Sequence, residues 1–294
     1  MKTIDRLSGQ FTASVLHPEI ISLCRKLLYL FLFSQTLLLL PVASEFWGPN
    51  SCMTPYYQNK SVVLDFLNLL QTQTFKNYYL FFVFGQLIFI LLSFFIKPQR
   101  VLGILIYFFT ATLHHKAAMV QNSGDVLALI LLFYFLLMNE NKTGAVNNAV
   151  TNFAFLAARL QVAFLYFVAG ISKLKGVHWV DGTALYYVFN ADEYSCSFAK
   201  NVLAKNSFFV YAGTYLTLFL QLGFPVLIWF RKTKSIAMLL GILVHLLIIF
   251  LMGLTGFGII MIISYSLFLS DETAGNILKK FRLKKYRETN LAKL

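Results

Sequence analysis

Residues 159–174 read RLQVAFLYFVAGISKL, and this stretch decides the fold class. It is apolar enough to enter a bilayer, yet it carries Arg159 at one end and Lys173 near the other. Ionisable side chains inside membrane helices are costly and usually functional. Successive intervals of 7, 4 and 3 residues place four side chains on one helical face: Arg159, Tyr166, Gly170 and Lys173. We expect this face to point into a protein interior or a wet cavity, because lipid would not tolerate it.

The composition predicts a polytopic membrane protein. The 294 residues are 58% hydrophobic and only 13% charged, whereas a soluble domain is about a quarter charged. The net charge of +13 does not indicate a nucleic-acid partner, because the basic residues lie in short loops and in the tail, as membrane topology requires. The partner that composition predicts is the lipid bilayer.

Eight apolar runs predict about eight transmembrane helices, with both termini on the same side. If the N-terminus is inside, 17 Lys and Arg residues lie inside and 7 outside, which favours cytoplasmic termini. We therefore predict an all-α polytopic membrane protein with a cytoplasmic segment 1–26, a transmembrane domain 27–270 and a basic cytoplasmic tail 271–294. The predicted spans lie near 27–43, 77–96, 101–118, 124–138, 150–171, 207–230, 235–252 and 256–270.

The first span also permits a second interpretation, as a signal peptide. Arg25 and Lys26 precede it, and small residues follow it at 43–44. Its 26-residue leader is long for a signal peptide, so we expect a retained span. Cleavage would leave the orientation of the other helices unchanged.

Two of the three cysteines, Cys52 and Cys196, fall on the predicted outside, where disulfides can form. A bridge between them would join the first outer loop to the loop 172–207. Two unrelated free thiols are an equally supported alternative. No spacing of Cys, His or carboxylate residues has a metal-ligand signature, so we expect no metal.

Lys173 is the leading candidate for chemistry. A lysine that is partly removed from water can supply a neutral amine, which can act as a base toward a phenol-like hydroxyl of a lipid-soluble ligand. The alternative is that Lys173 extends to the outer headgroups. His245 lies in the middle of its predicted span, where it is either an interhelical hydrogen-bonding residue or part of a proton path.

The remaining polar residues near the predicted spans favour structural roles. Arg159 cannot act as a base at ordinary pH, and together with Gln161 it is expected to hold helices together. Trp179 is expected to anchor the outer boundary, and Gly182 ends a turn signal. His114, His115 and Asn122 flank the outer turn between the third and fourth spans. The two adjacent histidines point about 100° apart on a helix and are a poor chelating pair.

The central motif resembles that of the vitamin K-dependent γ-glutamyl carboxylases and of the wider horizontally transferred transmembrane (HTTM) domain family. The matching positions are Arg159, Gln161, Tyr166, Phe167, Ala169, Gly170, Lys173, Leu174, Trp179 and Gly182. The resemblance implies that Lys173 is the base that deprotonates reduced vitamin K, a menaquinol-like quinol. It also implies that His245 takes part in catalysis and that Tyr166, Gly170, Asn122, His114 and His115 line the pocket.

The resemblance further implies an integral protein of the bacterial inner membrane that binds a quinone-type lipid in an outward-facing pocket. Such a protein would modify or mature an exported polypeptide, because short bacterial members of the family include proteins that help to mature an exported peptide toxin. Carboxylase-like lyase activity is one expectation. The alternative is a non-enzymatic membrane assembly factor or chaperone that retains the scaffold, in which Lys173 is structural.

Overall fold

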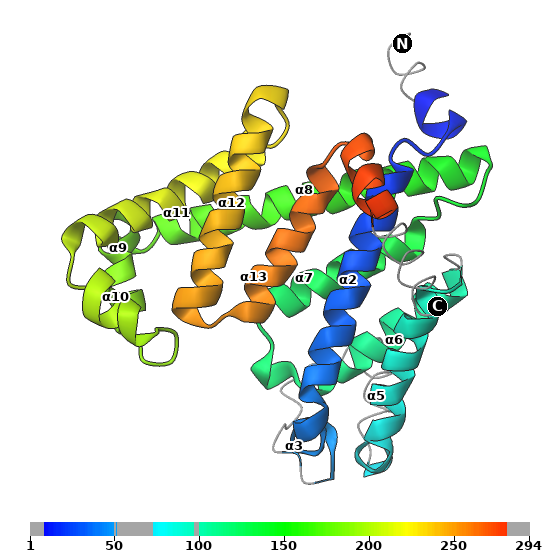
Figure 1. The fold of residues 1–294 in the computed structure, drawn as a ribbon, viewed down its shortest axis with the longest axis horizontal. Coiled ribbons are helices and arrows are strands. Elements are labelled where there is room, and N and C mark those ends of the chain that lie inside the picture. The colour runs from blue at the N-terminus through cyan, green and yellow to red at the C-terminus, as the bar shows by residue number, and fades with distance from the viewer. Residues whose placement is uncertain (1–8, 50, 52–72, 97–99, 281–294) are drawn as a thin grey trace, which may run out of the picture. The chain divides into compact units, whose positions relative to one another are not determined.

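The computed structural model describes residues 9–49, 51, 73–96 and 100–280 (Figure 1). These residues form helices, turns and connecting segments, and no strand occurs among them. The prediction of an all-α protein is therefore confirmed.

Every predicted apolar span contains a helix, and most boundaries agree within a few residues. The helices begin earlier than predicted at 27–43 and 150–171, and α13 ends earlier than the predicted span 256–270, at Ser264. The long helices are α2 (Pro18–Leu39), α5 (Gln73–Ser93), α6 (Arg100–Lys116), α7 (Ser123–Leu137), α8 (Ala145–Leu174), α11 (Ser207–Leu227), α12 (Arg231–Met252) and α13 (Thr255–Ser264). Short helical turns lie between or after them: η1 (Leu40–Val42), α3 (Ala43–Trp47), η2 (Ala118–Val120), α9 (Val177–Val180), α10 (Ala184–Asn190), η3 (Ala199–Leu203) and η4 (Tyr265–Phe268).

Four helical stretches in the described ranges are long and apolar enough to cross a membrane. They are Pro18–Trp47, Ala145–Leu174, Ser207–Leu227 and Arg231–Met252. Asn77–Ser93, Ser123–Leu137 and Thr255–Phe268 are apolar but shorter. The structure thus supports a membrane protein, while eight crossings and cytoplasmic termini stay predictions.

The chain divides into two compact units. Unit 1 comprises residues 1–155 and 270–294, and unit 2 comprises residues 156–269, so helix α8 contributes to both. Each unit is considered by itself below.

Unit 1 is built around aromatic packing between α3, α5 and α6. Its buried core includes Trp47, Phe82, Phe109 and Leu113, and the indole N–H of Trp47 donates to the Leu113 carbonyl at 2.9 Å. Gly85 permits the close approach of α5 and α6, because a Cβ atom there would overlap the Phe109 ring. Apolar packing thus joins α3, α5 and α6.

A buried polar chain links three helices of unit 1. The Thr36 hydroxyl donates to the Gln86 side-chain carbonyl at 2.8 Å, and the Gln86 amide donates to the Thr110 hydroxyl at 3.0 Å. All three side chains are buried, so these bonds supply partners that neither lipid nor apolar core could provide. The chain therefore sets the register of α2, α5 and α6.

In unit 2, α12 and α13 form a hairpin whose helices lie side by side (Figure 1). Helix α12 ends at Gly253, whose φ of 68° lies in the left-handed region that favours glycine after a helix. The hairpin brings the middle of α12 to the turn η4, which is where the site below is built.

Candidate functional site

Three buried aromatic side chains form a hydrogen-bonded network in unit 2. The Tyr166 hydroxyl, from α8, shares a hydrogen bond of 2.7 Å with Nε2 of His245, from α12. It shares a second hydrogen bond with the hydroxyl of Tyr265, at the start of η4. The exposed fractions are 3% for Tyr166, 4% for His245 and 1% for Tyr265, so water does not compete for these groups. We call these three residues the Tyr–His–Tyr network.

The network is enclosed by close packing. The Phe224 ring stacks on Tyr166 with centroids 4.3 Å apart, and Phe257 meets the His245 ring at 5.4 Å. Gly241 lies one helical turn before His245, and a Cβ atom there would overlap the Tyr265 hydroxyl. Glycine at position 241 is therefore what lets Tyr265 reach the network.

One polar atom of the network stays unsatisfied. Nδ1 of His245 is buried and has no hydrogen-bond partner among the described residues. A buried donor or acceptor without a partner costs about 1–3 kcal/mol. The imidazole therefore has an unused hydrogen-bonding position, which a proton or a small polar group can take.

Arg159 lies on the same helix, two turns before Tyr166, and its position favours the predicted structural role. Its guanidinium carbon lies 4.8 Å from the Trp229 ring centroid and 5.1 Å from that of Phe268. A guanidinium between aromatic faces is stabilised by cation–π attraction, worth about 2 kcal/mol when water is excluded. Gln161 is half-buried on the same helix.

Gly170 serves packing between α8 and α11. A Cβ atom at this position would lie 2.7 Å from a methyl carbon of Leu222 and 3.3 Å from the Gln221 backbone. The polar face predicted for residues 159–173 is therefore covered by α11 at Gly170 and by α12 and η4 at Tyr166. The prediction that this face points into a protein interior holds for these two residues, while their predicted contact with a cofactor is untested.

Lys173 lies in the last turn of α8, apart from the Tyr–His–Tyr network. Seven residues separate it from Tyr166, which is about 10 Å along the helix axis. Its Nζ lies 5.0 Å from the Trp179 ring centroid. The side chain is half-buried and forms no ion pair within the described ranges. Lys173 and the Tyr166 contact to His245 thus lie about two turns apart along α8, and a pocket shared by the lysine and the histidine stays a prediction.

The segment after Lys173 is held by a tight turn. Gly182 has a φ of 83° and packs against Tyr211 and Tyr215, which confirms the predicted turn. The Asp181 carboxylate accepts hydrogen bonds from the Thr183 hydroxyl at 2.5 Å and from its N–H at 2.9 Å. These bonds from Thr183 hold the pKa of Asp181 below its ordinary value. The turn begins where α9, the short helix that contains Trp179, ends at Val180.

Asn122 caps helix α7 in unit 1. Its side-chain carbonyl accepts from the Gly124 N–H at 2.7 Å, and the Asp125 carboxylate accepts from the Asn122 N–H at 2.9 Å. This reciprocal pair is a capping box. The other Asp125 oxygen accepts from the Gln35 amide at 2.9 Å. The Asn122 side chain predicted to line the pocket is thus already used by the helix start.

Replacement of Asn122 by alanine is expected to lower the free energy of unfolding by about 1 kcal/mol, because the N-cap is lost. Thermal unfolding of the purified chain in detergent measures this change. Asn141→Ala is the matched control, since that side chain is exposed and its loss should stay within about 0.5 kcal/mol. Equal stability of the two variants would contradict the capping role.

The other predicted residues of this region are half-buried. His114 has a buried Nδ1 without a hydrogen-bond partner among the described residues, and His115 follows it at the end of α6.

Cys196 is half-buried, and its N–H donates to the Leu251 carbonyl at 2.9 Å. Cys52 lies outside the described residues, so the disulfide stays a prediction. No cluster of three metal-ligating side chains occurs among the described residues.

Sequence reasoning missed Tyr265, Gly241 and Phe224. Tyr265 follows Tyr166 by 99 residues, and no local pattern joins them. Gly241 did carry a usable signal, because it precedes His245 by four residues and so shares its helical face. A glycine there indicates close approach by another element.

Known proteins resemble parts of this chain. The HTTM domain model matches residues 137–272. Sporulation-delaying protein SdpB of Bacillus subtilis (strain 168) is 27% identical over 171 residues, which cover 52% of this chain and 53% of SdpB. The uncharacterized protein YitO of the same strain is 32% identical over 112 residues, which cover 37% of this chain and 36% of YitO. The chain thus matches about half the length of SdpB and about a third of YitO. No solved structure matches.

The matched segment contains the Tyr–His–Tyr network as well as Arg159, Lys173 and Trp179. The resemblance of the central motif to the HTTM family is therefore confirmed, since the HTTM domain model matches the segment that contains it.

Proposed function

We propose that this chain is an integral protein of the bacterial inner membrane that binds a quinol-type lipid beside Lys173 and acts on an exported polypeptide. One observation carries the proposal: the Lys173 amine lies over the Trp179 ring and has no ion-pair partner among the described residues. An amine in that setting is available to a ligand. The HTTM domain and the similarity to SdpB, a sporulation-delaying protein, support a bacterial membrane role.

The donor set at the end of α8 fits a quinol chemically. The amine suits a phenol-like hydroxyl, the Trp179 ring offers a face for an aromatic head, and exposed apolar side chains such as Phe167 and Ile171 suit an isoprenoid tail. A bound quinol would supply two electrons on oxidation to the quinone.

Lys173 with Trp179 would have one role, and the Tyr–His–Tyr network would have another. Lys173 would accept the proton of the ligand hydroxyl, and Trp179 would orient the ring and exclude water from one side of the amine. The Tyr–His–Tyr network would hold α8, α12 and η4 in register. Through its unused Nδ1, His245 could also hold a proton inside the bundle.

The test compares Lys173→Ala with Lys175→Ala, an exposed lysine two residues later. Each variant is purified in mild detergent from menaquinone-producing cells, and the bound quinone is extracted and quantified. We expect about tenfold less quinone with Lys173→Ala, because a charge-assisted hydrogen bond is lost, and no change with Lys175→Ala. Exported polypeptides from the same cells should carry the mass change of a modification when Lys173 is present, and should lack it in Lys173→Ala. If Lys173→Ala keeps the wild-type quinone content and the exported polypeptides keep their wild-type masses, the proposal is contradicted.

A non-enzymatic assembly or chaperone role is the second candidate. Asn122 favours it, because its side-chain carbonyl oxygen accepts the Gly124 N–H of the α7 cap. Under this function the purified chain would hold no quinone. Lys173→Ala would then lower the unfolding temperature without changing the mass of any exported polypeptide.

A further inference from the structure

A cavity of about 660 Å³ lies in unit 1, and no residue of the central motif 159–182 lines it. It is formed by the start of α6, the end of α7 and the start of α8, with the segment that joins α7 to α8. Its charged lining side chains are Arg100 and Lys142, and no Asp or Glu lines it among the described residues. The cavity thus presents two positive charges and no negative charge.

Arg100 is held at this cavity by Asn147. Nη2 of Arg100 donates to the Asn147 side-chain carbonyl at 3.3 Å. The Asn147 amide in turn donates to the backbone carbonyls of Asn139 and Lys142, at 2.9 and 2.7 Å. Asn147 is buried, so this arrangement is protected from water. A guanidinium has five N–H groups, and a bond to Asn147 leaves others of Arg100 for an anion.

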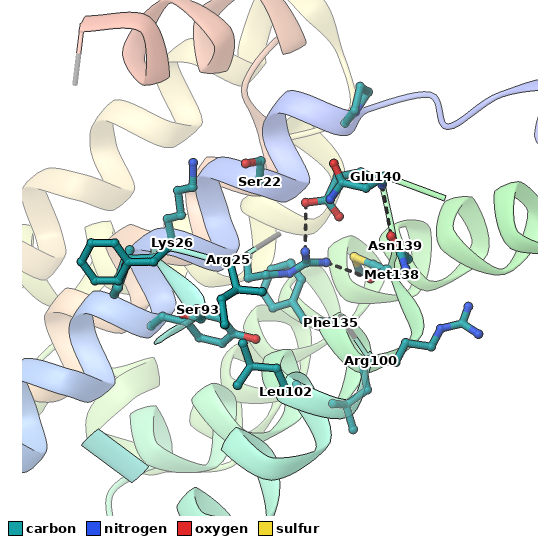
Figure 2. A pocket seen from close by; sticks show the side chains of 18 of the residues that line it. Ser22, Arg25, Lys26, Ser93, Arg100, Leu102, Phe135, Met138, Asn139 and Glu140 are labelled. Atoms are coloured by element: carbon teal, nitrogen blue, oxygen red, sulfur yellow. Dashed lines mark hydrogen bonds and ion pairs between the residues drawn. The ribbon is translucent and has the colours of Figure 1, made fainter. Parts of the chain in front are cut away.

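Glu140, between α7 and α8, does not cancel these charges. Its Oε1 lies 2.9 Å from Nη1 of Arg25, and Nη2 of Arg25 donates to the Met138 carbonyl at 2.8 Å. Figure 2 shows this buried ion pair, and the guanidinium of Arg100 extends away from it. Neither Arg100 nor Lys142 forms an ion pair within the described parts of the chain. Both positive charges are therefore available to an external anion.

The start of α8 adds positive character to the same cavity. Residues 143–147 line it, and α8 begins at Ala145. The first N–H groups of an α-helix have no acceptor within their helix and carry partial positive charge. The Thr143 hydroxyl is a further donor. These groups suit an anion that has several acceptor oxygens.

The rest of the lining is apolar and exposed. Ile104 lies on α6, Leu137 ends α7, and Val146 and Val150 lie in the first two turns of α8. All four side chains are exposed, although the helices that carry them are apolar. An apolar surface beside an anion site suits acyl chains, which a soluble phosphate compound lacks.

An anionic headgroup and acyl chains occur together in the anionic glycerophospholipids. We propose that this cavity binds such a lipid by its phosphodiester. The phosphodiester lies against Arg100 and Lys142, and the acyl chains lie along Ile104, Leu137 and Val150. The Lys and Arg count places Arg100 and Lys142 on the cytoplasmic side, so the lipid belongs to the inner leaflet.

The experiment measures binding of three probes to the full chain in detergent, by the shift of its unfolding temperature as each probe is titrated. The probes are dioleoyl-phosphatidylglycerol, dioleoyl-phosphatidylethanolamine and soluble glycerophosphoglycerol. We expect phosphatidylglycerol to bind about tenfold more tightly than phosphatidylethanolamine, whose ammonium would meet two cations and no carboxylate. The soluble headgroup should bind more weakly than either lipid, because it has no acyl chains.

Two variants locate the site. Arg100→Gln and Lys142→Gln should each bind phosphatidylglycerol about tenfold more weakly, because each removes one charge-assisted contact. Lys142 is exposed, so its variant tests the site even if Arg100→Gln fails to fold. Lys280→Gln is the matched control and should bind as wild type does, since Lys280 is an exposed lysine of unit 1 that does not line the cavity.

Four outcomes would overturn the inference. Equal binding of the two lipids would remove the role of the cations, and wild-type binding by Lys142→Gln and by any folded Arg100→Gln would place the lipid elsewhere. An equal loss in Lys280→Gln would show attraction to the overall positive charge and not to this cavity. Equally tight binding of glycerophosphoglycerol would make a soluble phosphodiester, and not a lipid, the ligand.

Discussion

Replacement of Arg25 by methionine is expected to lower the free energy of unfolding by about 3–5 kcal/mol. The substitution keeps most of the apolar volume but leaves the Glu140 carboxylate buried without its partner at 2.9 Å. It also removes the donor to the Met138 carbonyl. Unfolding of the detergent-solubilised chain, followed by intrinsic fluorescence, measures the loss.

Two further variants show whether the loss comes from the uncompensated charge. The double variant Arg25→Met, Glu140→Gln should recover a large part of the stability, because no charge is then left buried. Lys142→Met, at an exposed position, should change stability by about 0.5 kcal/mol or less. A double variant as unstable as Arg25→Met alone would show that the ion pair does not carry the effect.

Replacement of Tyr166 by phenylalanine is expected to have the second large effect. The ring and its stacking on Phe224 are kept, but His245 and Tyr265 both lose their hydrogen bond to the Tyr166 hydroxyl. Each buried polar group left without a partner costs about 1–3 kcal/mol. The decrease in the unfolding temperature of the purified variant reports the combined loss at His245 and Tyr265.

Tyr215→Phe is the matched control in the same unit. Its hydroxyl donates to the Val180 carbonyl at 3.2 Å at an exposed position, where water can replace the bond. The expected loss is about 0.5 kcal/mol. If the two variants are equally stable, the Tyr–His–Tyr network does not hold the second unit together.

The helices could be predicted from the sequence because the signal is local. Long apolar runs bounded by Lys, Arg, Pro or Gly mark each span, and a helix occurs in all eight predicted ranges. The position of Asp125 at a helix start was also predictable, since Asn122 and Asp125 have the spacing of a capping box. The Asp181-Gly182 turn belongs to the same group.

The partners across helices could not be predicted, because they depend on packing between segments far apart in the chain. Tyr166 was a candidate from its place on the polar face, but Tyr265 had no pattern that separated it from the other tyrosines. Arg25 and Glu140 are 115 residues apart, and each alone looks like an ordinary loop charge of a membrane protein. How far the His245 side chain lies from Lys173 could not be predicted either, because spacing along one helix carries no information on a side chain of another helix.

The end of α8 beside Lys173 is central to this account, and photoaffinity labelling with an azido-menaquinone analogue tests it most directly. After illumination of the chain in bacterial membranes, labelled peptides are identified by mass spectrometry, with excess menaquinone as competitor. We predict competed labelling within residues 166–180, lost in Lys173→Ala and kept in Lys175→Ala. Labelling confined to other segments, or equal labelling of these two variants, would contradict the account.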